Sequence, residues 1–152
     1  MDLMIMANQK SIKELRILSL DVGSKRMGLA LWNPGSKLAS PLEILHRKTL
    51  KEDLSKIENL IATHQVEAIL VGVPTSLAGK ETQSTQNAHF WIETLKQKFS
   101  IAIYSFDESL STRDAMDILR EHGVKATSKT AREKKDSIAA ALFLEEFIRA
   151  QD

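Results

Sequence analysis

The stretch Leu18–Trp32, LSLDVGSKRMGLALW, places a polar break containing Asp21 and Gly23 between two apolar segments. Residues 15–21 and 27–33 have the apolar composition of strands, and Gly23 suits a tight turn, so the stretch predicts a β-hairpin. A carboxylate among buried aliphatic side chains is costly unless something compensates for it. Asp21 therefore needs a partner or a bound cation.

The composition bounds the class of protein. The chain has 152 residues, of which 43% are hydrophobic, so it can bury a proper core as one domain. We expect residues 1–13 to form a loose extension and residues 14–152 to form that domain. Cysteine is absent, which excludes disulfides, thiolate zinc sites and thiol nucleophiles. The sequence has neither a signal peptide nor an apolar run of membrane-spanning length, which predicts a soluble, cytoplasmic protein.

Hydrophobic periodicity extends the prediction along the chain. After the NPGS breaker, residues 41–48 alternate enough to form a third strand. Further strands are expected at 66–73 and 101–106, because these runs are short and apolar. Helical stripes predict four helices, around residues 50–61, 88–99, 111–119 and 132–150. The chain is therefore expected to form an α/β fold with a mixed five-stranded sheet, in which three antiparallel strands precede βα crossovers and helices cover both faces.

Carboxylates occur where these predicted strands end. Asp21 closes the first strand, Asp107 and Glu108 follow the strand at 101–106, and Asp136 opens the last predicted helix. The carboxyl ends of neighbouring parallel strands form the edge where ligands bind in open α/β sheets. Three carboxylates brought together there repel one another unless a cation lies between them, and oxygen ligands suit Mg²⁺ or Mn²⁺. The acids meet if the first strand and the strand at 101–106 are parallel neighbours. Adjacent residues of an extended segment point in opposite directions, so Asp107 stays an alternative to Glu108.

Basic residues accompany these acids. The formal net charge of the chain is only +1. In the predicted loop at residues 125–135, however, every charged residue except Glu133 is basic. Such side chains can hold a nucleic-acid backbone without reading its sequence. The candidate backbone contacts are Lys25, Arg26, Lys129, Arg132 and Lys135.

Four motifs resemble those of the YqgF family, whose members are described as pre-16S rRNA nucleases and as Holliday-junction-resolvase-like proteins of the ribonuclease H fold. The motifs occur in the family's order: LDVGSKRMGLA, VGVPTSLAGKE, FDESLSTRDA and KKDSIAAALFL. The resemblance maps the family's acidic positions onto Asp21, Glu108 and Asp136. Two positions depart from the family pattern. Ser109 stands where Arg is common, which affects a phosphate contact, and Ala78-Gly79 stands where Asp-Gly is common.

The resemblance implies a metal-dependent nuclease that processes the 5′ end of precursor 16S rRNA, with Asp21, Glu108 and Asp136 as catalytic metal ligands. Two alternatives stay open. A Holliday-junction resolvase would cut branched DNA as a symmetric dimer, and a nucleic-acid-binding module would use the same surface with little turnover. The sequence does not decide between a monomer and a homodimer.

Simpler explanations exist for each feature taken singly. An acid at a strand end is often only a solvated stop, and Asp136 at a helix start would be favoured by the helix dipole. The basic loop could be an ordinary solvated surface. Gly72–Lys80 does not fit a P-loop, since its glycine spacing is wrong and Glu81 stands at the Ser/Thr position. The coincidence of three acids in a family-like arrangement is what favours the nuclease hypothesis.

Overall fold

The structure is a computed structural model that describes residues 10–74, 82–107 and 129–151, and within residues 129–136 the backbone alone. Its elements run in the order η1 (Ile12–Glu14), β1 (Ile17–Val22), β2 (Arg26–Trp32), β3 (Ser40–Pro41), β4 (Leu45–His46), α2 (Leu50–His64), β5 (Ala68–Val73), α3 (Gln83–Lys98), β6 (Ala102–Asp107) and α5 (Lys129–Arg149). The helix predicted at residues 111–119 lies outside the described residues.

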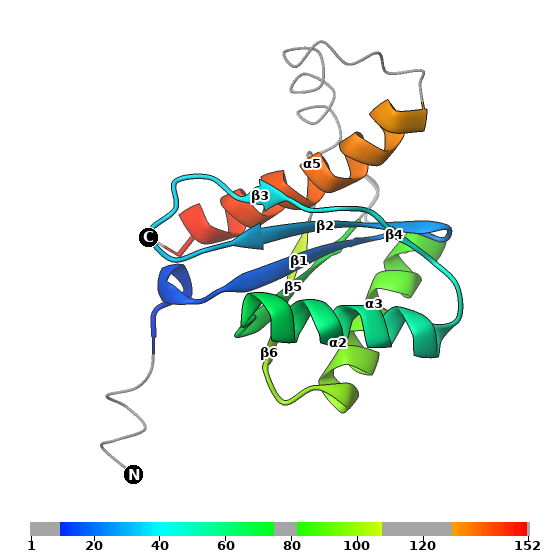
Figure 1. Cartoon of the computed structure of the whole chain (residues 1–152), viewed down its shortest axis with the longest axis horizontal. Coiled ribbons are helices and arrows are strands. Elements are labelled where there is room, and N and C mark those ends of the chain that lie inside the picture. The colour runs from blue at the N-terminus through cyan, green and yellow to red at the C-terminus, as the bar shows by residue number, and fades with distance from the viewer. Residues whose placement is uncertain (1–9, 75–81, 108–128, 152) are drawn as a thin grey trace.

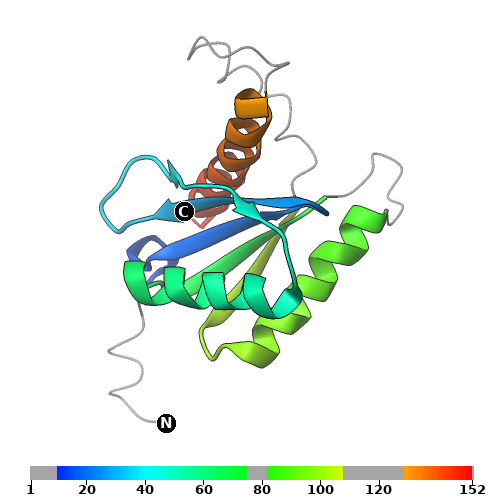
Figure 2. The same ribbon diagram turned by 45° about the vertical axis from the view of Figure 1, so that its right-hand side comes forward.

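One mixed sheet forms the centre of the molecule. Its strand order is β3-β2-β1-β5-β6, with β4 also paired to β2. Strand β1 pairs antiparallel with β2, whereas the pairs β1–β5 and β5–β6 are parallel. Strands β1 and β6 thus run the same way, but β5 lies between them, so they are not the direct neighbours considered from the sequence. In Figures 1 and 2, α5 covers one face of this sheet and α2 and α3 cover the other. The predicted mixed sheet with helices on both faces is confirmed.

The strand predicted at residues 41–48 is instead two short strands, so the described part of the chain contributes six strands to the sheet and not five. Both pair with β2: Pro41 lies opposite Ala30, and His46 lies opposite Arg26. Pro41 has no N–H to donate to the strand ladder. At the next residue, the Leu42 carbonyl accepts a hydrogen bond of 2.8 Å from Ser137 of α5. A helix side chain thus binds the edge where a continuous strand was expected.

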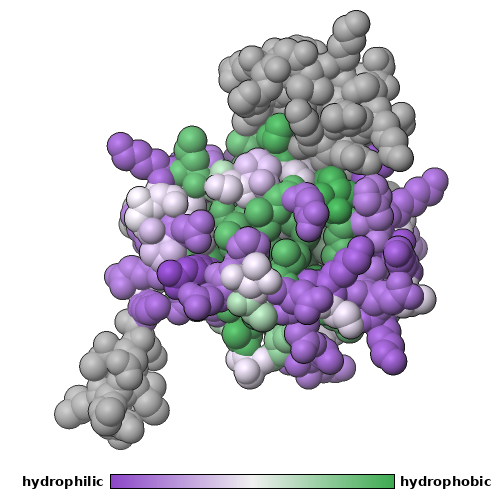
Figure 3. Space-filling model, in the orientation of Figure 1, coloured by the Kyte–Doolittle hydropathy of each residue, from purple (hydrophilic) through white to green (hydrophobic). Residues whose placement is uncertain are grey.

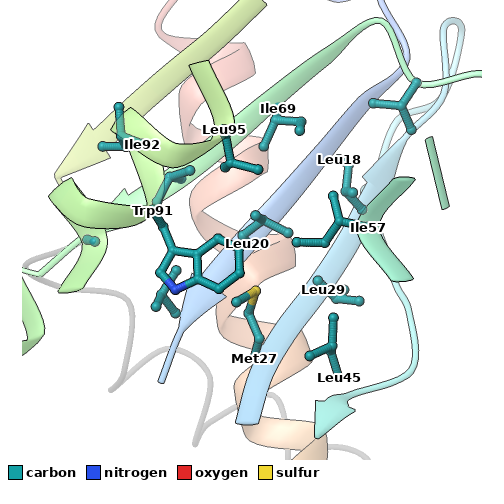
Figure 4. Close-up of a cluster of buried hydrophobic side chains, with 14 of the residues drawn as sticks. Leu18, Leu20, Met27, Leu29, Leu45, Ile57, Ile69, Trp91, Ile92 and Leu95 are labelled. Atoms are coloured by element: carbon teal, nitrogen blue, oxygen red, sulfur yellow. The ribbon is translucent and has the colours of Figure 1, made fainter. Parts of the chain in front are cut away.

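The faces of the sheet alternate between two cores. Leu18 and Leu20 of β1 point toward α2 and α3, where Ile57 and Trp91 complete a cluster drawn in Figure 4. Ile17 points the other way and packs with α5 residues that include Phe143 and Phe147. Successive side chains of β1 therefore point alternately to the α2 and α3 face and to the α5 face. Polar side chains dominate the periphery of the surface in Figure 3.

Helix α5 begins earlier than predicted. It starts at Lys129, so residues 129–135 of the predicted basic loop are helical. Lys, Arg, Glu and Ala are strong helix formers, and a run rich in them extends a helix as readily as it forms a loop. Asp136 consequently lies about two turns inside α5 and not at its start. A helix-dipole role is therefore a weak explanation for Asp136, because that effect fades beyond the first turn.

The amino ends of β1 and β5 are tied together by Glu67. Its carboxylate accepts a hydrogen bond from the backbone N–H of Arg16 at 3.2 Å and pairs with Lys10 at 2.9 Å. The indole N–H of Trp32 donates to the Lys13 carbonyl at 3.1 Å, next to this clamp. Among the helices of the described segments, none is long and apolar enough to cross a membrane.

Candidate functional site

A hollow of about 280 Å³ lies where β1 turns into β2. It is lined by Asp21, Gly23, Ser24, Lys25 and Arg26. Asp21 is half-buried, Arg26 is partly exposed and Lys25 is exposed. A carboxylate and two cationic side chains thus share one small concave surface, whereas the roles predicted for these three residues stay predictions.

The turn that forms this hollow depends on Gly23. A Cβ atom on Gly23 would collide with the backbone carbonyl oxygen of Arg26. The obstacle is backbone and cannot move aside as a flexible side chain would. Glycine is therefore required here for the close approach of the two strands, which brings Lys25 and Arg26 back beside Asp21.

Asp21 lies on the face of the sheet that α5 covers. Ile17 packs against α5, and the Ser19 hydroxyl donates a hydrogen bond of 2.9 Å to the Ala140 carbonyl of α5. Because side chains alternate along a strand, Asp21 follows these two residues on the same face. Its partner in β2 is Gly28, which places no side chain beside it. At this register position, β2 therefore adds only backbone beside the carboxylate.

The path of α5 leads toward the same edge. Phe147 contacts Tyr104 in a tilted pair and Phe143 stacks near Phe106, so α5 runs antiparallel to β6 and to β1, which is parallel to β6. Going from Ala140 toward the start of α5, one helical turn reaches Asp136, and going from Ser19 toward the end of β1 reaches Asp21. The start of α5 and the β1–β2 turn accordingly lie toward the same end of the sheet in Figure 1. The backbone thus brings Asp136 to the edge that holds Asp21.

Strand β6 fixes the direction of Asp107, one of the two rival acids. Tyr104 and Phe106 contact α5 with ring-centroid distances of 5.5 Å and 6.1 Å, so the even-numbered residues of β6 face α5. Ile103 packs with the opposite core, and Asp107 follows it by alternation. Asp107 is exposed on the face away from Asp21. Glu108 lies outside the described residues.

The other predicted contacts are only partly described. Lys129, Arg132 and Lys135 lie in the first two turns of α5, whose start is at the site's edge of the sheet. Their side chains, and that of Asp136, are not described. Within the described residues, no group of three His, Asp or Glu side chains is gathered closely enough to hold a metal ion. The complete three-carboxylate cluster stays a prediction.

Sequence reasoning missed two residues behind the turn. Arg47 donates a hydrogen bond of 3.0 Å to the Gly23 carbonyl and forms an ion pair of 3.3 Å with Asp53. Asp53 is buried, with 1% of its side chain exposed. It lies beside Leu54 and Ile57 on the apolar stripe of α2. A charged residue on an apolar stripe is the sequence feature that could have revealed a buried ion pair here.

The chain matches known proteins over most of its length. A family model described as "RuvX: Holliday junction resolvase" matches residues 15–150. The chain is 34% identical over 136 residues to a protein of Desulforamulus reducens, a match covering 88% of this chain and 96% of the relative. It is 32% identical over 133 residues to a protein of Koribacter versatilis, covering 88% and 86% respectively. Both relatives carry the name "Putative pre-16S rRNA nuclease".

Solved structures share the fold at low sequence identity. Thermus thermophilus RuvC in complex with a Holliday junction superposes with a TM-score of 0.54 at 15% identity, covering 90% of this chain and 96% of that one. The Fowlpox virus resolvase bound to Holliday junction DNA gives a TM-score of 0.54 at 11% identity, covering 88% and 99%. These likenesses confirm the ribonuclease H-like fold.

Proposed function

Because this chain belongs to the RuvX family of nucleases, the YqgF family predicted from its motifs, we propose that it hydrolyses phosphodiester bonds of precursor 16S rRNA with the aid of a divalent metal ion. The observation that carries the proposal is the position of Asp21. This carboxylate stands at the carboxyl end of β1, in the hollow beside Lys25 and Arg26, on the face that α5 covers. Ligands of open α/β sheets bind at that edge.

Asp21, Glu108 and Asp136 are the proposed catalytic residues. Asp136 is favoured because the backbone of α5 brings it to the edge that holds Asp21. Glu108 is favoured over Asp107, because Asp107 follows Ile103 onto the face away from Asp21. The three residues would then approach one cation from β1, β6 and α5.

The residues at the hollow fit a hard divalent cation. Asp21 supplies a half-buried carboxylate that lines the hollow, and Gly28 opposite it in β2 has no side chain. Oxygen ligands of this kind suit Mg²⁺ or Mn²⁺. When bound, one or two such ions would supply Lewis acidity that activates water and offsets the charge of the phosphodiester. Asp21, Glu108 and Asp136 would hold them.

Five basic residues are the proposed contacts to the nucleic-acid backbone. Lys25 and Arg26 line the hollow, and Lys129, Arg132 and Lys135 belong to the first turns of α5. Contacts with phosphate hold a strand in register but do not distinguish sequences. Choice of substrate then rests on the shape of the nucleic acid and not on base contacts.

The names of the relatives support precursor 16S rRNA as the substrate. The 5′ end is the expected processing site. A four-way DNA junction is the second candidate, because the family model is described as a Holliday junction resolvase. Two-strand cleavage of a junction would require a symmetric dimer of this chain. A third candidate, binding without turnover, shares the same surface.

The test is cleavage of end-labelled precursor rRNA and of a four-way junction, with Mn²⁺ or Mg²⁺ present or chelated, by wild type and Asp21→Asn. The variant removes one charge at nearly constant shape. We expect metal-dependent cleavage by wild type and a loss of at least about 10³-fold in the variant. The preferred substrate identifies the pathway. If wild type binds both nucleic acids but cuts neither, the nuclease proposal is wrong and the binding module replaces it.

A further inference from the structure

Arg47 links the site's turn to the opposite face of the sheet. Its backbone N–H donates to the Lys25 carbonyl at 2.9 Å, and its guanidinium donates to the Gly23 carbonyl at 3.0 Å. One residue therefore holds two carbonyl groups of the segment that lines the hollow. These contacts extend the pairing of β4 with β2, in which His46 lies opposite Arg26.

Asp53 holds Arg47 in this position. One carboxylate oxygen accepts from the Arg47 guanidinium at 3.3 Å, and the other accepts from the backbone N–H of Lys48 at 3.0 Å. Only 1% of the Asp53 side chain and 22% of the Arg47 side chain are exposed. The buried Asp53 carboxylate therefore fixes both the Arg47 guanidinium and the backbone of the next residue, Lys48.

Trp91 of α3 completes the support. The Arg47 guanidinium lies over the Trp91 ring, 5.3 Å from its centroid. Trp91 is itself buried in the cluster between the sheet and α2 and α3, where Figure 4 shows its ring beside Leu20 and Met27. The arginine thus stands on a rigid part of the core.

We propose that Arg47, held by Asp53 and Trp91, is a positioning residue that fixes the Gly23 carbonyl and thereby sets the place of residues 23–26 beside Asp21. The proposal rests on the proposed function for its effect on cleavage, but not for its effect on the turn. Among the described residues that line the hollow, Arg47 is absent. It reaches the turn from the α2 and α3 face, whereas Asp21 belongs to the α5 face.

Arginine is required because one planar group makes all three contacts. Its fork donates in two directions, to Asp53 and to Gly23, while its flat face lies on the indole ring. A lysine ammonium keeps the charge but is a compact donor that cannot satisfy this geometry. Arg47→Lys therefore tests positioning while leaving net charge unchanged.

The first readout is amide hydrogen exchange in the metal-free protein, for wild type, Arg47→Lys and Asp53→Asn. Glu67→Gln is the matched control, because it neutralises a carboxylate at the other end of β1, where Glu67 pairs with Lys10 and accepts from Arg16. We expect residues 23–26 to exchange at least about tenfold faster in the first two variants, with Ile17–Leu20 within about twofold of wild type. Unchanged exchange at the turn, or equal acceleration throughout β1, would overturn the proposal.

The second readout is the kinetics of cleavage by the same proteins. We expect Arg47→Lys to lower kcat by about tenfold with little change in KM, since a displaced turn misplaces reacting groups more than it weakens backbone binding. Glu67→Gln should keep the wild-type kcat. If wild type does not cleave but the exchange result holds, the proposed function fails and the positioning role stands. If wild type cleaves and Arg47→Lys matches it in both readouts, the positioning role fails alone.

Discussion

The two ends of strand β1 differ in the surroundings of their acidic side chains. At the amino end, Glu67 accepts the N–H of Arg16 and pairs with Lys10, so its charge is used up in a clamp. At the carboxyl end, Asp21 lines a hollow together with Lys25 and Arg26. The same strand therefore carries a structural carboxylate contact at one end and a candidate ligand at the other.

The difference follows from the direction of the parallel strands. Strands β1, β5 and β6 run the same way, so their carboxyl ends collect at one edge, where connections leave the sheet and ligands bind. At the amino ends, the contacts of Glu67 join β1 to β5. An acid at a strand end is thus informative when it lines a hollow at the carboxyl edge, and Asp21 meets that condition whereas Glu67 lies at the amino edge.

Gly23→Ala should have the larger effect of the two substitutions, because it disturbs the carboxyl end of β1 and leaves the amino end intact. The added Cβ collides with the Arg26 backbone, so the turn must shift at a cost of about 1–3 kcal/mol in unfolding free energy. We expect cleavage to fall by about tenfold or more as Lys25 and Arg26 move from Asp21. Urea denaturation and a cleavage assay measure the two effects.

Gly35→Ala is the matched control for that variant. Gly35 has a φ of +82° with nothing near its missing Cβ, so alanine there is strained by about 1 kcal/mol but displaces no neighbour. It should lose stability and keep activity per folded molecule. Equal loss of activity in both variants would mean that the turn has no special part in the site.

Glu67→Gln should give the smaller effect, confined to stability. The Lys10 hydrogen bond lowers the pKa of Glu67 from its ordinary value of 4.5, burial opposes this, and the Arg16 N–H adds to the lowering. A lowered folded-state pKa stabilises the fold above 4.5, and that contribution is lost as pH falls through the folded pKa. Since the pair is partly exposed, we expect a loss below about 1 kcal/mol at pH 7.

Denaturation of wild type and Glu67→Gln at pH 7 and at decreasing pH provides the measurement. The stability gap should close once the pH drops below the lowered pKa of Glu67. A gap that persists unchanged in acid would show that the stabilisation comes from packing and not from charge.

Local patterns predicted the hairpin, the parallel strands and the position of Asp21, because alternation and strand-end acids depend on nearby residues. The broken edge at β3 and β4 was not predictable, since it depends on Ser137 reaching Leu42 from far along the chain. The start of α5 was missed because the basic run suits a helix as well as a loop. The role of Arg47 was not predicted, because Gly23 and Trp91, which it contacts, are far from it in the sequence.

The most direct test of the central claim is Mn²⁺ binding, measured by calorimetry on wild type, Asp21→Asn and Glu67→Gln without nucleic acid. Wild type and Glu67→Gln should bind Mn²⁺ equally, and Asp21→Asn at least about tenfold more weakly, because it loses a charged oxygen ligand. Equal binding by all three proteins would contradict the claim that Asp21 is a metal ligand at the carboxyl end of β1.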